Sequence, residues 1–334
     1  MSPDAVSLSV VVPLFNEQDV IEKLYEEIAR AVEPMKRTWE IVFINDGSTD
    51  DTLNRVLDVA GRDDRVVVVD LMGNFGQTAA LSAGFDCARG DIIVAMDGDL
   101  QDDPSYIPRL VSKLEEGYDI VSGWRKKRKE SFLIRRIPSM TANWMLKRIS
   151  GIDIHDFGTT FKAYRASVVK NVKMYGDFHR FIPALAREMR VRVTEVEVAH
   201  HKREYGESKY GIGRTFVVFF DLFRLKFILD YLSKPLQVFG AGGLGLAVIG
   251  FILFLYVAFS KFYLGIPIEE KHGPLFITSI MFIVSGVNLF TTGLLGEMIL
   301  RNLYESGDKK SYYIREIHGT SRESNNSKTL MKTR

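Results

Sequence analysis

Short apolar runs alternate with amphipathic stretches of helical periodicity from residue 8 to residue 124. The apolar runs are typical of buried strands, which we expect at 9–14, 40–45, 66–71, 91–96 and 119–122. Helices are expected between them at 18–33, 51–60, 77–88 and 105–116. Repeated strand-helix units of this kind predict an α/β fold, with a Rossmann-like, mostly parallel sheet covered by helices on both faces.

Two longer apolar segments follow, at 235–260 and 273–296, and neither contains a charged residue. Each exceeds the ~20 residues that a helix needs to cross about 30 Å of hydrocarbon, although a buried pair of soluble helices is an alternative. Basic residues flank the pair on both sides, whereas the loop between the segments has only Lys261 and Lys271 beside two glutamates. Positive charge favours the cytoplasmic side, so we expect an integral inner (plasma) membrane protein with two spans and both termini in the cytoplasm.

Two other segments combine apolar and basic residues. The segment 215–232 is strongly apolar but contains four charged residues, and 138–150 mixes aromatic and aliphatic side chains with Lys147 and Arg148. Both fit helices that lie on an anionic membrane surface, and a helix with one buried face is the alternative for 138–150. The expected organisation is a cytoplasmic domain at 1–214, an interfacial amphipathic helix at 215–234, a two-helix membrane domain at 235–300 and a cytoplasmic tail at 301–334 with a possible strand at 311–317.

Composition narrows the function classes. The net charge of +2 over 334 residues is too balanced to indicate a nucleic-acid-binding protein. Cys87 is the only cysteine, so neither a disulfide within the chain nor a cysteine-based metal site is possible. No Gly-x-Gly-x-x-Gly follows the first expected strand, which argues against a nicotinamide cofactor. The short apolar start at 6–15 lacks the features of a signal peptide, so the N-terminal part is expected to stay in the cytoplasm.

An acidic cluster follows the expected strand at 91–96. Asp97 and Asp99 are two residues apart, which places both carboxylates on one side of an extended segment. Converging carboxylates repel each other unless a cation lies between them, and their hard oxygen atoms favour Mg²⁺ or Mn²⁺. Mg²⁺ typically takes one or two protein carboxylates and completes its shell with water and substrate phosphates, which predicts a diphosphate ligand. An acidic turn that caps the helix beginning near Pro104 is the alternative.

Polar residues also follow the first three expected strands. Pro13, Asn16 and Glu17 follow the first, and Asp46 follows the second. The carboxyl ends of parallel strands form the edge at which open α/β sheets bind ligands. Asp46 precedes a glycine there and is suited to accept hydrogen bonds from a nucleobase or ribose. The third strand is followed by a glycine-containing loop, 73–77, that opens a helix.

Four motifs carry a resemblance to a known family. They are Val-Val-Pro-Leu-Phe-Asn-Glu at 11–17, Asn-Asp-Gly-Ser-Thr-Asp at 45–50, Asn-Phe-Gly-Gln at 74–77 and Asp-Gly-Asp-Leu-Gln-Asp-Asp-Pro at 97–104. In this order they resemble the GT-A glycosyltransferases of family two, and more narrowly the polyprenyl-phosphate sugar transferases, such as dolichyl-phosphate mannose synthases and undecaprenyl-phosphate glucosyltransferases. The resemblance implies inverting transfer of a hexose from a nucleotide-sugar, first of all UDP-glucose, to undecaprenyl (polyprenyl) phosphate.

The same resemblance assigns roles to individual residues. It implies that Asp97, Asp99 and Gln101 are catalytic and hold the metal, and that Asp156 orients the sugar or the acceptor. The implied donor-binding residues are Pro13, Asn16, Glu17, Asp46, Asn74, Gln77, Arg203, Ser208 and Lys209. The last three belong to a glycine-containing loop that is expected to close over the bound donor and exclude water.

Arginine side chains mark the expected acceptor site. Guanidinium groups bind phosphate bidentately, and Arg125 and Arg135 match the acceptor-phosphate arginines of the family, with Ser139 as a hydroxyl partner. Asp156-Phe-Gly-Thr-Thr-Phe161 resembles a family segment in which Ser-Gly stands where this chain has Thr159 and Thr160. A phosphate monoester is already largely dianionic at neutral pH, so no essential catalytic base is expected.

Other functions remain as alternatives at this point. A mannose synthase using GDP-mannose would share the motifs, and so would a processive polysaccharide synthase, although the Gln-x-x-Arg-Trp motif of such synthases is absent from the sequence. A nucleotide-sugar-binding membrane scaffold without activity belongs to another class. The argument against it is the presence of five expected site residues, Asp97, Asp99, Arg125, Arg135 and Lys209. The C-terminal strand offers a contact for a homo-oligomer.

Overall fold

The computed structural model describes residues 6–126, 147–148, 150–172, 174, 178–201, 235–265, 267, 272–305 and 310–319. The chain divides into two compact units. One comprises Met1–Val218 with Lys310–Arg334, and the other comprises Phe219–Lys309. The C-terminal segment therefore belongs to the same unit as the N-terminal sheet.

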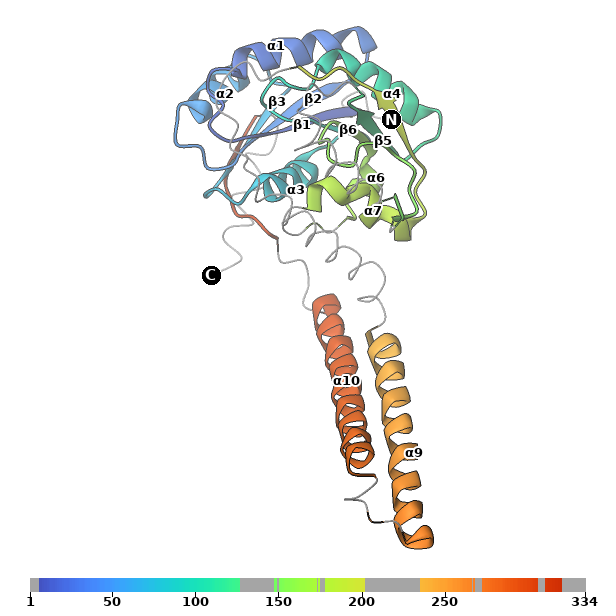
Figure 1. Cartoon of the computed structure of the whole chain (residues 1–334). Coiled ribbons are helices and arrows are strands. Elements are labelled where there is room, and N and C mark those ends of the chain that lie inside the picture. The colour runs from blue at the N-terminus through green and yellow to red at the C-terminus, as the bar shows by residue number, and fades with distance from the viewer. Residues whose placement is uncertain are drawn as a thin grey trace. The chain divides into compact units, whose positions relative to one another are not determined.

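The first unit is built on an eight-stranded sheet (Figure 1). Its strand order is β7-β5-β6-β4-β1-β2-β3-β8. The strands are β1 (Leu8–Leu14), β2 (Trp39–Asn45), β3 (Val66–Leu71), β4 (Ile92–Ala95), β5 (Ile120–Trp124), β6 (Lys162–Arg165), β7 (Val193–Glu197) and β8 (Ile314–His318). The central strands β3, β2, β1 and β4 are parallel to one another, as the strand-helix alternation predicted.

Helices cover both faces of this sheet (Figure 1). One face carries α1 (Ile21–Val32), α2 (Thr52–Ala60) and α4 (Ile107–Glu115), and the other carries α3 (Gln77–Cys87), α6 (Ala166–Val169) and α7 (Ile182–Leu185). Alternate side chains of β1 separate the two cores, because Val10 and Val12 pack in one and Val11 packs in the other. This arrangement confirms the predicted GT-A-like α/β architecture.

Two antiparallel strands modify the predicted sheet. β6 lies between β4 and β5 and is antiparallel to both. No strand was expected at 162–165, because four residues are too few to give a clear alternation. At the other edge β8 pairs antiparallel with β3. The C-terminal strand therefore pairs with β3 of the same chain.

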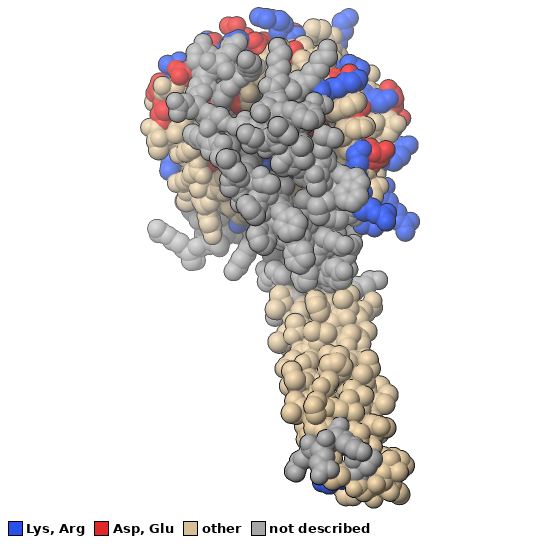
Figure 2. Space-filling model, in the orientation of Figure 1, with Lys and Arg blue, Asp and Glu red and all other residues tan. Residues whose placement is uncertain are grey.

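The second unit contains two long helices, α9 (Ala241–Leu264) and α10 (Gly273–Glu305). A π-helical turn, η7 (Leu236–Gly240), precedes α9. By length and composition, Leu236–Leu264 and Gly273–Ile299 could each cross a membrane, with mean hydropathies of 2.4 and 1.8. Figure 2 shows an almost uncharged surface along these helices, whereas charged residues crowd the surface of the sheet unit.

Glycines bring the two helix backbones into direct contact. A Cβ atom added at Gly243 would lie 2.6 Å from the carbonyl oxygen of Gly286, and one added at Gly286 would lie 2.5 Å from the carbonyl oxygen of Gly243. A Cβ atom on Gly250 would lie 2.8 Å from the carbonyl oxygen of Ser279. Such close approach through small residues is typical of helices packed in lipid.

Candidate active site

Polar residues gather at the carboxyl edge of the sheet, because parallel strands all leave the sheet on that side. The loops after β1 and β2 supply Asn16 and Asp46, the loop after β4 supplies Asp97 and Asp99, and Arg125 follows β5. β1 lies between β2 and β4, so the strand order reverses at this point. Ligands of open α/β sheets bind in the crevice at such a reversal.

The loops after β1 and β2 hold each other. The Asn16 side-chain oxygen accepts a hydrogen bond from the Thr49 backbone nitrogen at 2.8 Å, and the Asn16 backbone nitrogen donates to Ser48 Oγ at 3.1 Å. Asn16 has a φ of 57°, a left-handed conformation that asparagine tolerates better than most residues. Glu17 donates its backbone N–H to Thr52 Oγ1 at 2.9 Å. Asn16 and Glu17 therefore join the two loops as well as bordering the predicted donor site.

Asp46 organises the loop that follows β3. Its two carboxylate oxygens accept hydrogen bonds from the backbone nitrogens of Phe75 and Gly76 at 2.7 and 2.9 Å. Burial raises the pKa of Asp46, and these two hydrogen bonds lower it again in part. Next to it, a Cβ atom on Gly47 would lie 2.4 Å from the Gly73 carbonyl carbon. Asp46 was expected to accept hydrogen bonds from a nucleoside, and in the structure it shapes the loop against which that nucleoside is expected to lie.

Asp97 is held close to other carboxylates. Gln77, the first residue of α3, donates from Nε2 to Asp97 Oδ1 at 2.6 Å and to Thr160 Oγ1 at 3.3 Å. Burial and the neighbouring charges of Asp102 and Asp99 raise the pKa of Asp97 to about 7. Position 98 needs glycine, because a Cβ atom there would lie 2.5 Å from Leu14 Cδ2. The sequence alone did not reveal this close approach.

These residues fit a divalent cation. No group of three or more His, Cys, Asp or Glu side chains suited to a metal occurs in the described part of the chain. Mg²⁺ needs only one or two protein carboxylates when a diphosphate completes its shell. Burial is the largest cause of the raised pKa of Asp97, and the negative charges of Asp102 and Asp99 raise it further, so a bound cation would offset part of the shift. Gln101, the third expected ligand, donates from Nε2 to the carbonyl oxygen of His201 at 3.4 Å and from its backbone nitrogen to Asp99 Oδ1 at 3.2 Å.

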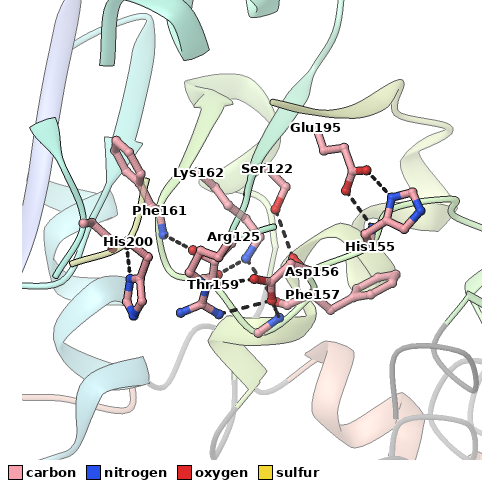
Figure 3. Close-up of polar contacts among 12 residues, drawn as sticks. Ser122, Arg125, His155, Asp156, Phe157, Thr159, Phe161, Lys162, Glu195 and His200 are labelled. Atoms are coloured by element: carbon pink, nitrogen blue, oxygen red, sulfur yellow. Dashed lines mark hydrogen bonds and ion pairs between the residues drawn. The ribbon is translucent and has the colours of Figure 1, made fainter. Parts of the chain in front are cut away.

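Arg125 and Asp156 form a buried bidentate pair (Figure 3). Arg125 Nε donates to Asp156 Oδ2 at 2.8 Å, and Arg125 Nη2 donates to Asp156 Oδ1 at 3.1 Å. Burial lowers the pKa of Arg125, but the charge of Asp156 and its hydrogen bonds raise it more, so the pKa lies above its ordinary value. Among the described residues Nη1 has no hydrogen-bond partner, which leaves one edge of the guanidinium for a ligand.

Lys162 lies next to this pair, fully buried in β6 (Figure 3). Its Nζ donates to the carbonyl oxygen of Phe157 at 3.2 Å and also to that of Thr159. Burial lowers the pKa of Lys162 to about 7, although the charge of Asp156 opposes this shift. Lys162 therefore fixes the turn that connects Asp156 to β6.

A short antiparallel bridge joins the acidic motif to residues 200–201. Asp102 pairs with His200 through the backbone, and His201 N donates to the Gln101 carbonyl oxygen at 2.8 Å. The side chains of Asp102 and His200 approach to 3.6 Å. Because Arg203 follows two residues later in the chain, this bridge anchors one end of the expected donor-covering loop.

Several predicted site residues fall outside the described part of the chain. They are Arg135, Ser139, Arg203, Ser208 and Lys209, together with almost all of the expected interfacial segments 138–150 and 215–234. Of the remaining predicted residues, Pro13 lies at the end of β1 and Asn74 is exposed in the loop after β3.

Sequence reasoning missed Lys162, Asp102 and Thr160. A lysine next to the apolar Phe161 suggests an exposed position, and only the unpredicted insertion of β6 between β4 and β5 buries it. Asp102 belongs to the same acidic run as Asp97 and Asp99, and those two carboxylates were sufficient for the expected metal site, so no role was assigned to Asp102. The position of Thr160 beside Gln77 depends on two segments far apart in the sequence, so no local pattern could have indicated it.

Comparisons with known proteins agree with this geometry. The model of the family described as "Glycosyl transferase family 2" matches residues 9–173. A dodecaprenyl-phosphate galacturonate synthase of Rhizobium johnstonii is 44% identical, over 94% of this chain and 93% of its own length. An undecaprenyl-phosphate 4-deoxy-4-formamido-L-arabinose transferase of Edwardsiella ictaluri is 34% identical, over 93% of this chain and 94% of its own. Similarity therefore extends through both units.

Among solved structures, one described as a mycobacterial protein covers 65% of this chain and 75% of its own length, with a TM-score of 0.50 and 20% identity. This likeness concerns the fold alone.

Proposed function

Because the chain belongs to glycosyltransferase family 2 and is a glycosyltransferase acting on polyprenyl phosphate, we propose that it transfers one sugar from a UDP-sugar to undecaprenyl phosphate with a divalent cation. The observation that carries this proposal is the position of Arg125 at the same sheet edge as Asp97 and Asp99. A guanidinium with a free edge suits an acceptor phosphate, and paired carboxylates suit the cation of a donor diphosphate.

The donor nucleoside binds against the loops after β1, β2 and β3 in this proposal. Pro13, Asn16 and Glu17 border one side, and the loop held by Asp46 borders the other. Gln77 connects that loop to Asp97, so the nucleoside and diphosphate parts of the site are mechanically joined. Arg203, Ser208 and Lys209 then cover the diphosphate and keep water away from it.

Asp97, Asp99 and Gln101 hold the cation. When bound, it neutralises negative charge that accumulates on the departing nucleoside diphosphate. The chain itself would orient the diphosphate, and Asp99 lies near enough to Asp97 for its charge to raise the pKa of Asp97. Gln77 supports this by fixing Asp97 through a hydrogen bond of 2.6 Å.

Arg125, Arg135 and Ser139 hold the acceptor phosphate. Asp156 occupies two nitrogens of Arg125 and so presents the remaining edge of the guanidinium in one orientation. A phosphate dianion is nucleophilic without proton removal, so positioning is the main task of these residues and no general base is assigned. Attack opposite the departing diphosphate inverts the configuration at the anomeric carbon.

The acceptor places the reaction at the cytoplasmic face of the inner membrane. The segments Leu236–Leu264 and Gly273–Ile299 serve as the membrane anchor, with both termini and the catalytic unit in the cytoplasm. The residues 138–150 and 215–234 lie in the headgroup region and guide the lipid phosphate towards the sheet edge. This topology rests on the distribution of basic residues around the two spans.

A uronic acid is the donor sugar that we propose first. The relative with 44% identity over nearly the whole chain is named for galacturonate, which favours UDP-galacturonate over the UDP-glucose expected from the sequence. Relatives at 34% identity are named for a formamido-arabinose, so the sugar differs between proteins that share these motifs.

A transfer assay tests the proposal. Membranes containing the full-length protein receive undecaprenyl phosphate, Mg²⁺ or Mn²⁺, and one labelled donor at a time: UDP-galacturonate, UDP-glucose, UDP-4-deoxy-4-formamido-L-arabinose or GDP-mannose. We expect a single-sugar, organic-extractable, mild-acid-labile lipid from UDP-galacturonate, and no product after chelation of the metal. Membranes without the protein provide the control.

Each alternative gives a different product. Transfer from UDP-glucose alone would contradict the uronic acid, and transfer from GDP-mannose would contradict the UDP-sugar. A polymer that is not extracted with lipid would indicate a processive synthase, and nucleotide binding without any product would indicate a scaffold.

A further inference from the structure

β8 contacts the nucleotide-side loops although it is the last strand of the chain. It follows α10 in the chain, after residues 306–309, and it pairs with β3 in the sheet. An edge strand needs only backbone hydrogen bonds to its neighbour. Side-chain contacts of β8 and of Tyr313, just before it, reach further, towards the loops that the proposed function assigns to the donor nucleoside.

Arg315 begins a chain of hydrogen bonds that ends at Asn16. Its Nη1 donates to Asp70 Oδ2 at 3.0 Å, and Asp70 Oδ1 accepts from Asn45 Nδ2 at 2.7 Å. The Asn45 side-chain oxygen then accepts from the Ser48 backbone nitrogen at 3.2 Å, and Ser48 Oγ accepts from the Asn16 backbone nitrogen at 3.1 Å. The first two steps join β8 to the strand residues Asp70 and Asn45, and the last two steps reach the loops after β2 and β1.

Tyr313 makes a second connection, to the loop after β3. Its ring centre lies 6.0 Å from that of Phe75, and its carbonyl oxygen accepts from the Met72 backbone nitrogen at 2.9 Å. Arg315 Nη2 donates to the Met72 carbonyl oxygen at 3.1 Å. Phe75 is the residue whose backbone N–H donates to Asp46, so Tyr313 and Asp46 contact the same loop residue.

The positive charge of Arg315 compensates the buried negative charge of Asp70. The Asp70 side chain is 4% exposed, and a buried carboxylate needs a compensating charge. Among the described residues Arg315 is the only basic partner of Asp70. Tyr312 and Lys310 attach the start of the segment, because Tyr312 Oη donates to Asp86 Oδ2 at 2.5 Å and Lys310 Nζ lies 3.0 Å from the same oxygen.

We propose that β8 together with Tyr313, the residue before it, is a positioning segment for the donor nucleotide, in which Arg315 and Tyr313 hold the loops after β2 and β3 in their binding conformation. This inference rests on the proposed function, because it requires the nucleotide to lie against these loops. Donor affinity thereby depends on a segment that the chain reaches only after both membrane helices.

The test uses the full-length protein in lipid nanodiscs. UDP and GDP are first titrated into the wild type with Mg²⁺, and the nucleotide that binds is then titrated into Arg315→Ala, Arg315→Lys and Tyr313→Ala. Glu316→Gln is the matched control, because Glu316 lies on the same strand with a side chain that is 65% exposed. For every variant the KM of the donor, the KM of polyprenyl phosphate, kcat and the thermal midpoint are measured.

We expect Arg315→Ala and Tyr313→Ala to raise the nucleotide dissociation constant and the donor KM roughly three- to tenfold, as loss of one partly exposed charged contact or of one aromatic pair predicts. The acceptor KM should change less than about twofold, because the loops concerned face the donor. Arg315→Lys should restore most of the affinity, and Glu316→Gln should match the wild type.

The outcomes separate this inference from the proposed function. A lower thermal midpoint in Arg315→Ala with unchanged nucleotide affinity would make β8 a structural edge strand only, and would overturn the inference while the transfer activity stands. Equal losses of donor and acceptor affinity would overturn it as well. If the wild type binds neither nucleotide, the proposed function fails and the inference fails with it.

Discussion

Asp156→Ala tests how the acceptor phosphate is held. The substitution removes both oxygens that bind Arg125, at 2.8 and 3.1 Å, and one of them, Oδ1, also accepts from the Gly158 backbone nitrogen at 3.1 Å. Removing one partner of a buried ion pair typically costs about 3–5 kcal/mol. The Arg125 side chain is 14% exposed and keeps some access to water, so we expect a loss of stability near about 3 kcal/mol.

The catalytic effect should fall on the acceptor. Without Asp156 the guanidinium can rotate, and the edge that binds phosphate is no longer presented in one orientation. We expect the KM of polyprenyl phosphate to rise roughly 10- to 100-fold, equivalent to about 1.4–2.8 kcal/mol, with the donor KM nearly unchanged. The assay is steady-state transfer at varied acceptor and saturating donor. Asp153→Ala is the matched control, because that carboxylate is 89% exposed and lies three residues away.

A double-mutant cycle makes the reasoning refutable. If Asp156 acts only through Arg125, the double variant Asp156→Ala/Arg125→Ala should be no worse in acceptor KM than Arg125→Ala alone. A large fall in kcat for Asp156→Ala at unchanged acceptor KM would refute the argument, because Asp156 would then act on the reacting sugar itself.

Two further predictions concern Asp99 and Lys162. Asp99→Ala should abolish transfer while the protein stays folded and in the membrane; full activity of this variant, or activity that persists in excess chelator, would contradict a metal-assisted donor site. Lys162→Met removes the donor to the Phe157 and Thr159 carbonyl oxygens and should change the pH dependence of stability. The pKa of Lys162 is lowered to about 7, so between pH 7 and about 10.4 the unfolded chain binds more protons and the wild type gains stability as pH rises. Thermal midpoints from pH 7 to 9 should rise less steeply in Lys162→Met, and parallel curves would contradict the assignment.

The sequence predicted the parallel half of the fold well, because each central strand is an unbroken apolar run followed by a polar turn. β1, β2 and β3 are buried almost throughout, and the turns after them contain the glycines and Asx residues that such turns require. The local sequence pattern did not predict strands whose position depends on pairing across the whole sheet. β6 has four residues, and its place between β4 and β5 follows from pairing with strands distant in sequence.

The sequence predicted which residues belong to the site, but it did not predict which of them contact one another. Asp97, Asp99 and Arg125 were identified because carboxylates and guanidinium groups have few roles at a sheet edge. Their partners depend on tertiary structure: Asp156 reaches Arg125 from 31 positions away, and Arg315 reaches Asp70 from 245 positions away. Asp46 was given a direct role with the nucleoside, since its backbone partners at 75 and 76 could not be seen in the sequence.

The glycine contacts between α9 and α10 limit how the enzyme can recognise its lipid. At Gly243 and Gly286 the two backbones touch, so no space remains there for a polyprenyl chain between the helices. On the proposed function, the isoprenoid tail then lies outside this contact between α9 and α10. Such an enzyme recognises its lipid acceptor mainly at the phosphate end. Acceptors that differ by a few isoprene units should therefore compete on nearly equal terms.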